Sequence, residues 1–251
     1  MREIACPTPR SWSPAEDDGP TRGCVAPRRL HGWHLGGAEI EELFTVPSGG
    51  GEPCHVAVDP TGRLLVATNY AGGSLAILTL DPAGGPAADG LYPLPAGGSG
   101  VDAARQDAPH PHQAVFDGDL LYVTDLGADL IRRYPGARGP AGQRGAGTAR
   151  GPCRAAGHRP DLTRTPDGGH VIVANRGVDT LGVVATGPEP RQVAEVDAGV
   201  KWPQHLAWSG SRLYVAGWDS DAVSCFDWAG SSLRPAGIAV RCGEPGWLLA
   251  E

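Results

Sequence analysis

Residues 112–134 read HQAVFDGDLLYVTDLGADLIRRY, and the same order of strands and turns recurs in three other stretches. These are HVAVDPTGRLLVATNYAGGSLAIL (55–78), RTPDGGHVIVANRGVDTLGVV (164–184) and HLAWSGSRLYVAGWDSDAVSCF (205–226). Each has a short apolar strand, a turn rich in Asp, Gly or Ser, a second strand, a polar connection and a third strand. Such turn residues close tight hairpins between antiparallel strands. The pattern predicts a series of small antiparallel sheets.

The spacing of the repeat predicts how these sheets assemble. Successive units are 56, 50 and 42 residues apart when aligned on Asn69, Asp125, Asn175 and Gly217. A period of about 40–50 residues with several strands per unit is typical of β-propeller blades, which stack around a central channel. The polar connections after the second strands then lie together at one end of the channel. The repeat gives three histidines equivalent places near this end, namely His55, His112 and His205.

Composition favours an all-β protein. The 251 residues include 38 Gly and 24 Pro, and the hydrophobic residues come in short clusters without long helical patterns. A net charge of −7 argues against nucleic-acid binding, because no basic stripe is present to neutralise phosphates. The chain has no apolar run long enough to span a membrane, and its N-terminus has no signal-peptide core. Six cysteines form no C-x-x-C pair, so we expect a reduced, cytoplasmic protein.

Several of these stretches resemble the lactonase family of seven-bladed β-propellers, which includes the propeller-type 6-phosphogluconolactonases and their carboxymuconate-cyclase relatives. The resemblance is carried by PHPHQAVFDGDLLYVTDLGADLIRRY, GEPCHVAVDPTGRLLVATNYAGGSLAIL and VIVANRGVDTLGVV, and it covers roughly residues 36–251. The Pro-His-x-His segment followed by Asp-Leu-Gly-x-Asp is its more specific part. The resemblance implies an incomplete or shortened relative of a seven-bladed propeller.

The chain departs from the family in two regions. Residues 1–34 match no opening blade, and we expect an irregular segment there, followed by a propeller domain over 35–251. Residues 137–160 read as a Gly/Arg/Ala-rich linker where about one or more blades are missing. The family's Gly-Pro-Arg-His blade start is displaced to GPCRAAGH (151–158), and its Asn-Glu connection with a proposed catalytic glutamate has no counterpart. Either the propeller is shortened or the reading frame is damaged at both places.

The chemistry of lactone hydrolysis selects the candidate residues. The reaction needs a base for water, a donor near the developing oxyanion and an anchor for an anionic substrate. Histidine suits the first role at neutral pH, and arginine binds phosphate or carboxylate through two parallel hydrogen bonds. With the resemblance, the catalytic candidates are His112, His110 and Arg176. The substrate-binding candidates are His205, Arg154 and His55.

We expect no metal and no cofactor. The His110-Pro-His112 pair lacks a third ligand, carboxylates at useful spacing are absent, and no G-x-S-x-G nucleophile motif occurs. The resemblance implies hydrolysis of 6-phosphogluconolactone to 6-phosphogluconate. Two alternatives stay open: a non-catalytic or degenerate propeller that only binds, and a lactonase or cyclase that acts on another carboxylated lactone. The expected partner is therefore a phosphorylated sugar lactone or another anionic lactone, with no nucleic acid and no membrane.

Overall fold

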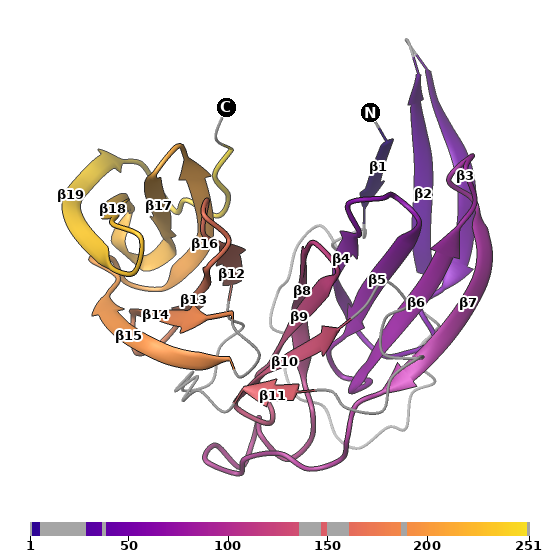
Figure 1. The fold of residues 1–251 in the computed structure, drawn as a ribbon, viewed down its shortest axis with the longest axis horizontal. Coiled ribbons are helices and arrows are strands. Elements are labelled where there is room, and N and C mark those ends of the chain that lie inside the picture. Colours follow the sequence, from indigo (N-terminus) through magenta and orange to yellow (C-terminus); the bar gives the residue numbers. More distant parts are fainter. Residues whose placement is uncertain are drawn as a thin grey trace.

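The chain forms an open arc of antiparallel sheets (Figure 1). The computed structural model describes residues 2–5, 29–36, 39–135, 147–149, 161–186 and 190–249. These residues form five sheets, and their helical structure is limited to a 3-10 turn at Trp218–Ser220. The all-β propeller class predicted from the sequence is confirmed.

The sheets follow one another along the chain. Sheet 1 has three strands: β1 (Arg2–Ala5), β2 (Arg29–Gly36) and β3 (Glu39–Pro47). Sheet 2 has β4 (Pro53–Val58), β5 (Leu64–Asn69), β6 (Ser74–Leu80) and β7 (Pro86–Pro93). Sheet 3 has β8 (Pro111–Asp117), β9 (Leu120–Asp125), β10 (Leu130–Pro135) and β11 (Gly147–Ala149). Sheet 4 has β12 (Asp161–Arg164), β13 (His170–Asn175), β14 (Thr180–Ala185) and β15 (Arg191–Asp197). Sheet 5 has β16 (Pro203–Ser209), β17 (Arg212–Gly217), β18 (Ala222–Trp228) and β19 (Leu233–Arg241).

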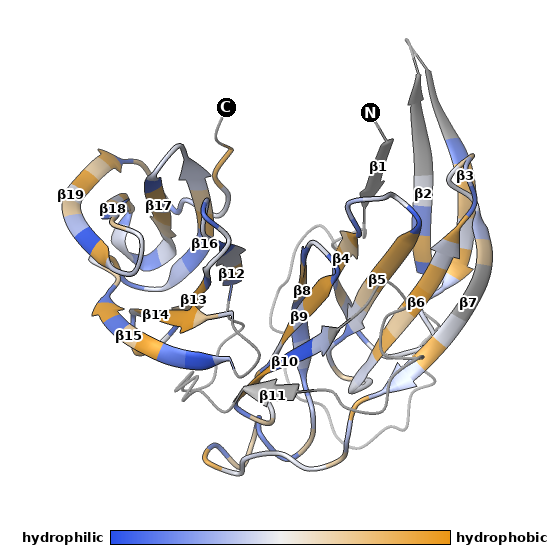
Figure 2. Cartoon of the chain, in the orientation of Figure 1, coloured by the Kyte–Doolittle hydropathy of each residue, from blue (hydrophilic) through white to orange (hydrophobic). Residues whose placement is uncertain are grey.

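Each sheet is a simple meander whose first strand lies on the inner side of the arc. The first strands β4, β8, β12 and β16 contact one another in turn along the chain. The second strands are the most buried, and every residue of β5 is buried, whereas exposed and half-buried residues alternate along the outer strand β15. In Figure 2, β5 is mostly orange, whereas β15 changes from blue to orange along its length. This ordering is that of propeller blades.

Apolar side chains fill the spaces between neighbouring sheets. Val66 of sheet 2 packs in one cluster with Val123 of sheet 3, and Ile172 of sheet 4 packs in another with Val215 of sheet 5. All four are fully buried. Full burial of such a side chain contributes about 1.5–3 kcal/mol. These clusters hold the successive sheets in fixed positions.

The two regions expected to be irregular contain strands. The sequence predicts an irregular segment over residues 1–34, but β1 and most of β2 lie there. The prediction missed them because residues 1–34 contain no copy of the repeat that identified the other sheets. The linker expected at 137–160 contains β11. The rest of that linker, and residues 6–28, lie outside the described residues. Among the residues that the structure describes, no helix is long and apolar enough to cross a membrane.

Candidate functional site

The predicted residues gather at one end of the sheets. In a four-stranded meander, the first strand begins at the end where the second strand turns into the third. Pro111 therefore pairs with Asp125, and Pro203 pairs with Gly217. His112 and His205 follow these two prolines, and Arg176 lies in the connection between β13 and β14. All three residues thus lie at the corresponding end of their sheets.

The equivalence of the three repeat histidines is wrong by one residue. At the start of each of β4, β8 and β16, a bulge places two residues of the first strand opposite one residue of the second. The second residue of the bulge is His55 in sheet 2, Gln113 in sheet 3 and His205 in sheet 5, whereas His112 is the first. The turn between β4 and β5 is longer than that between β8 and β9. Aligning the repeats on their histidines therefore shifted sheet 3 by one residue relative to sheets 2 and 5.

The shared second position carries a hydrogen bond from each sheet to the next. The side chain at this position accepts a hydrogen bond from a backbone N–H of the next sheet. The donor is the residue directly after the same position in the first strand of that sheet. The bonds run from Ala114 N to His55 Nδ1 at 3.4 Å, from Leu162 N to Gln113 Oε1, and from Leu206 N to Asp161 Oδ2 at 2.7 Å. The His55 side chain therefore joins two sheets. Burial lowers the pKa of this imidazole to about 4, so it is neutral at pH 7.

His110 and His112 lie beside an aromatic residue of the preceding sheet. The His110 ring stacks on Tyr70, with centroids 4.7 Å apart, and the His112 ring meets Tyr70 edge-on at 6.4 Å. His110 Nδ1 lies 3.0 Å from the Tyr70 carbonyl and its Nε2 lies 3.4 Å from Asp107 Oδ1. The backbone carbonyl of His112 accepts a hydrogen bond of 2.7 Å from Thr68 Oγ1, which fixes the start of β8. Tyr70, which the sequence assigns to turn structure, is part of this cluster.

Arg176 and His205 are brought together at the start of β16. Arg176 is 7% exposed, and its guanidinium donates to the carbonyl oxygens of Pro203, at 3.2 Å, and Gln204, at 2.7 Å. Burial, and secondarily the Arg176 charge, lower the pKa of His205 to about 4. His205 Nδ1 accepts the Leu248 N–H at 3.2 Å, so the ring proton of the neutral imidazole sits on Nε2. The same ring stacks on Trp247 at 3.7 Å.

Asp161 is a site residue that the sequence did not reveal. It is buried, and burial raises its pKa to about 6, against the opposing effects of the Leu206 N–H and the Arg176 charge. A buried carboxyl group beside an arginine and a histidine is the kind of group found at functional sites. The repeat offered a signal for Asp161, because this residue occupies in sheet 4 the position that His55 and His205 occupy in sheets 2 and 5. Strand β12 is short, and the sequence therefore did not show how it aligns with the other first strands.

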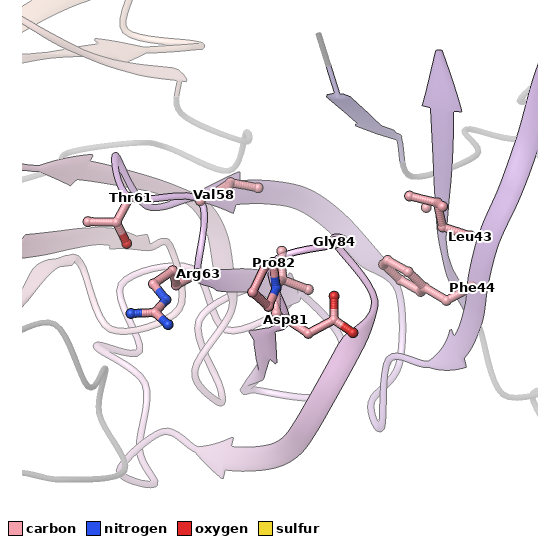
Figure 3. A pocket seen from close by; sticks show the side chains of 11 residues that line it. Leu43, Phe44, Val58, Thr61, Arg63, Asp81, Pro82 and Gly84 are labelled. Carbon is pink, nitrogen blue, oxygen red and sulfur yellow. The ribbon is translucent and has the colours of Figure 1, made fainter. Parts of the chain in front are cut away.

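Other candidate features lie apart from this end. Arg154 lies outside the described residues. A cavity of about 510 Å³ lies between sheets 1 and 2, at the opposite end of the meander. Figure 3 shows Leu43 and Phe44 on one side of it and the turns around Arg63 and Asp81 on the other. None of the predicted residues lines it. Within the described ranges, no group of three or more His, Cys, Asp or Glu residues is placed to hold a metal ion.

Comparison with known proteins gives a family match along most of the chain. A sequence model of the family described as "Lactonase, 7-bladed beta-propeller" matches residues 28–141 and 146–250. A 6-phosphogluconolactonase from Formosa agariphila is 33% identical over 89 residues. That segment is 34% of this chain and 25% of the relative, so it spans about a quarter of the relative's length.

Solved structures agree on the fold. The periplasmic gluconolactonase PpgL of Pseudomonas aeruginosa is 19% identical, with a TM-score of 0.53, over 89% of this chain and 80% of that one. A catalytically inactive virginiamycin B lyase from Staphylococcus aureus, determined with quinupristin, is 16% identical, with a TM-score of 0.63. The match covers 89% of this chain and 67% of the lyase. At these identities the likeness concerns the fold alone.

Proposed function

The chain belongs to the lactonase family of seven-bladed β-propellers, and on that premise we propose that it hydrolyses a lactone of the 6-phosphogluconolactone type to the open-chain acid. The observation that carries the proposal is the family match over residues 28–141 and 146–250. Two groups at the same end of the sheets support it, namely His110 and His112 beside Tyr70, and Arg176, His205 and Asp161 near the start of β16.

In the proposed reaction, His112 is the base. It takes a proton from a water molecule whose oxygen bonds to the lactone carbonyl carbon. The carbonyl becomes an oxyanion, the ring C–O bond then breaks as the carbonyl re-forms, and the protonated His112 returns its proton to the departing alkoxide, which becomes a hydroxyl group. His110 is the weaker choice for the base, because the Tyr70 carbonyl and the Asp107 carboxylate both face its ring nitrogens. This arrangement suits a residue that positions the substrate.

His205 and Arg176 are the groups proposed to stabilise negative charge in the site. The Nε2–H of neutral His205 is a donor suited to the developing oxyanion. Arg176 makes two bonds to backbone carbonyls, and its charge offsets the negative charge of a phosphate or carboxylate group nearby. Because the Arg176 guanidinium also holds β16 in place, its role in anion binding and its role in structure are coupled.

Lactone hydrolysis measured against a no-protein control tests this proposal, since 6-phosphogluconolactone also opens spontaneously. The family's catalytic glutamate has no counterpart, and the loss of a positioned acid or base lowers rates by about 10²–10⁴-fold. We therefore expect weak acceleration together with retained binding of 6-phosphogluconate.

Two comparison substrates separate the alternatives. Gluconolactone removes the phosphate, and a carboxylated lactone replaces it with a carboxylate. Faster hydrolysis of the carboxylated lactone would move the proposal to that substrate class. Binding of 6-phosphogluconate with no acceleration of any lactone would leave a non-catalytic binding protein instead of an enzyme.

A further inference from the structure

The bulge that carries His112 takes two residues out of the regular pairing of their sheet. The register of β8 against β9 runs from Pro111 directly to Ala114, so His112 and Gln113 both lie opposite Thr124. Gln113 is buried and His112 is half-buried. A bulge disrupts the ladder of hydrogen bonds, and buried backbone groups that leave the ladder need other partners. The peptide group between His112 and Gln113 is such a case.

Two buried threonines bond this peptide group at both ends. Thr68 Oγ1, in β5 of the preceding sheet, donates to the His112 carbonyl at 2.7 Å. The Gln113 N–H donates to Thr124 Oγ1, in β9 of the same sheet, at 3.1 Å. Because a peptide group is planar, bonds to both its carbonyl and its N–H fix its orientation and, with it, the position of the His112 Cα atom.

The Thr68 hydroxyl group serves the next sheet more closely than its own. Thr68 Oγ1 lies 3.5 Å from the carbonyl of His55 in sheet 2, against 2.7 Å from the carbonyl of His112 in sheet 3. Cys54 Sγ also lies 3.1 Å from the His112 carbonyl, but a thiol is a weak donor. Thr68 is therefore the stronger of these two donors.

At the start of sheet 5 a different residue supplies the corresponding bond. Gln204 is the first residue of the bulge there, as His112 is in sheet 3, and its carbonyl accepts from Arg176 at 2.7 Å. Ala174 holds in β13 the place that Thr68 holds in β5, and alanine has no hydroxyl group to donate. The threonine donor is thus a feature of the bulge that carries His112.

The residue after β5 differs in the same way. Tyr70 holds in sheet 2 the place that Arg176 holds in sheet 4, directly after the last residue of the second strand. The Tyr70 ring packs against the rings of His110 and His112. At the start of β8, Thr68 therefore bonds the carbonyl of His112 while Tyr70 contacts its ring.

We propose that Thr68 and Thr124 are positioning residues for His112. Their hydroxyl groups fix the peptide group of the base from two neighbouring sheets, and they thereby set the distance between the imidazole and the water that it activates. This role rests on the proposed function, in which His112 is the base. A displacement of about 1 Å lowers rates by as much as about 10²-fold. Loss of either hydroxyl group should therefore lower kcat and leave KM nearly unchanged.

Valine and serine variants separate the hydroxyl group from the rest of the side chain. Thr68→Val and Thr124→Val keep the branched shape and remove the hydroxyl group, whereas Thr68→Ser keeps the hydroxyl group. Thr165→Val is the matched control. The buried Thr165 hydroxyl group also bonds the backbone of a histidine, accepting from the His170 N–H at 3.1 Å, but at the opposite end of sheet 4.

Steady-state hydrolysis of 6-phosphogluconolactone, corrected for spontaneous opening, is the first measurement. We expect kcat to fall by about tenfold or more in Thr68→Val and Thr124→Val, with KM within about twofold of the wild type. Thr68→Ser should restore most of the lost kcat, and Thr165→Val should keep the wild-type value. A general loss of stability would affect the control as well.

NMR of the histidine rings is a second measurement, and it does not depend on turnover. The His112 ring meets the Tyr70 ring edge-on at 6.4 Å, so the chemical shifts of its carbon-bound protons report its position beside that ring. We expect these shifts to change in Thr68→Val, to return in Thr68→Ser and to stay constant in Thr165→Val. The signals of His205 should stay constant in all three.

The two measurements distinguish a failure of the positioning role from a failure of the proposed hydrolysis. If the wild type does not accelerate lactone opening, the proposed function fails, and the ring shifts still decide whether the threonines hold His112. Unchanged His112 shifts in Thr68→Val would overturn the positioning role. So would an unchanged kcat in an active protein, or an equal loss of kcat in Thr165→Val. Thr124→Val decides in the same way if Thr68→Val does not fold.

Discussion

At the scale of single residues, the histidines near the starts of the first strands have different roles. His55 and His205 are neutral at pH 7, because burial lowers the pKa of each to about 4. Each uses Nδ1 as the acceptor for a backbone N–H of the following segment. His112 instead stands beside Tyr70, with its backbone held by Thr68. The imidazoles of His55 and His205 therefore link neighbouring segments of the chain, whereas the imidazole of His112 is the candidate base.

His55→Gln tests the structural role through its pH dependence. Gln113 performs the same task in sheet 3, so glutamine at position 55 should keep the bond to Ala114 without a titrating group. The folded-state pKa of His55 lies below its unfolded value of 6.5. Its contribution to stability is therefore complete above pH 6.5 and is lost as the pH falls toward 4.

Urea unfolding at pH 7.5 and pH 5 measures this contribution. We expect the wild type to lose on the order of 1–2 kcal/mol more than His55→Gln between the two pH values. Asp161 acts in the opposite direction, because its raised pKa costs stability as the pH rises through about 6, but both proteins share that effect. Equal pH dependence of the two proteins would show that the His55 ring is not buried as described.

Arg176 is the residue whose loss should affect both stability and binding. Arg176→Met keeps a similar length but leaves the carbonyls of Pro203 and Gln204 without their donor and Asp161 without its cation. We expect a loss of about 2–4 kcal/mol in urea unfolding and weaker binding of 6-phosphogluconate. Arg164→Met is a control, because Arg164 pairs with Asp117 in a more exposed position. Equal losses in the two variants would contradict the role assigned to Arg176.

At the scale of elements, hydrogen bonds between first strands set the positions of the sheets. Gln113 makes two such bonds, accepting from the N–H of Leu162 and donating to the Leu162 carbonyl at 2.9 Å. Without the Gln113 amide, the buried N–H and carbonyl groups of Leu162 lose their hydrogen-bond partner. Leaving buried polar groups unsatisfied costs more free energy than a hydrogen bond contributes on balance. Gln113 therefore couples sheets 3 and 4, in addition to the apolar cluster packed between them.

Gln113→Ala should destabilise the protein by about 2–3 kcal/mol. Gln192→Ala is the matched control, because Gln192 lies on the outer strand β15 and bonds only weakly to Glu195, at 3.4 Å. Thermal unfolding of both variants gives the comparison. A control that loses as much stability as Gln113→Ala would refute the coupling.

The sequence predicted elements better than registers. Turn residues such as those of DPTG and FDGD identified the hairpins of sheets 2 to 5, since few residues adopt tight turns. β1 and β2 were missed because residues 1–34 contain no copy of the repeat. The family resemblance put forward His112 and Arg176 as candidates. The bulges that set His112 apart from His55 cannot be read from the residues, and so the place of Asp161 in the repeat stayed hidden.

At the scale of the whole molecule, the arc brings the starts of successive first strands to one end. His112 of sheet 3, Arg176 of sheet 4 and His205 of sheet 5 lie there, with buried Asp161 between the last two. The central claim is that this end of the arc accelerates lactone opening with His112 as the base. Its failure would leave the fold intact and remove the proposed chemistry.

The most direct test is the hydrolysis rate of 6-phosphogluconolactone with the wild type, His112→Ala and His170→Ala, each corrected for spontaneous opening. His170 begins β13 at the opposite end of its sheet, so its replacement should leave the rate unchanged. We expect His112→Ala to lose all acceleration while it still binds 6-phosphogluconate. Full activity in His112→Ala, with the wild type active, would contradict the role of His112 as the base.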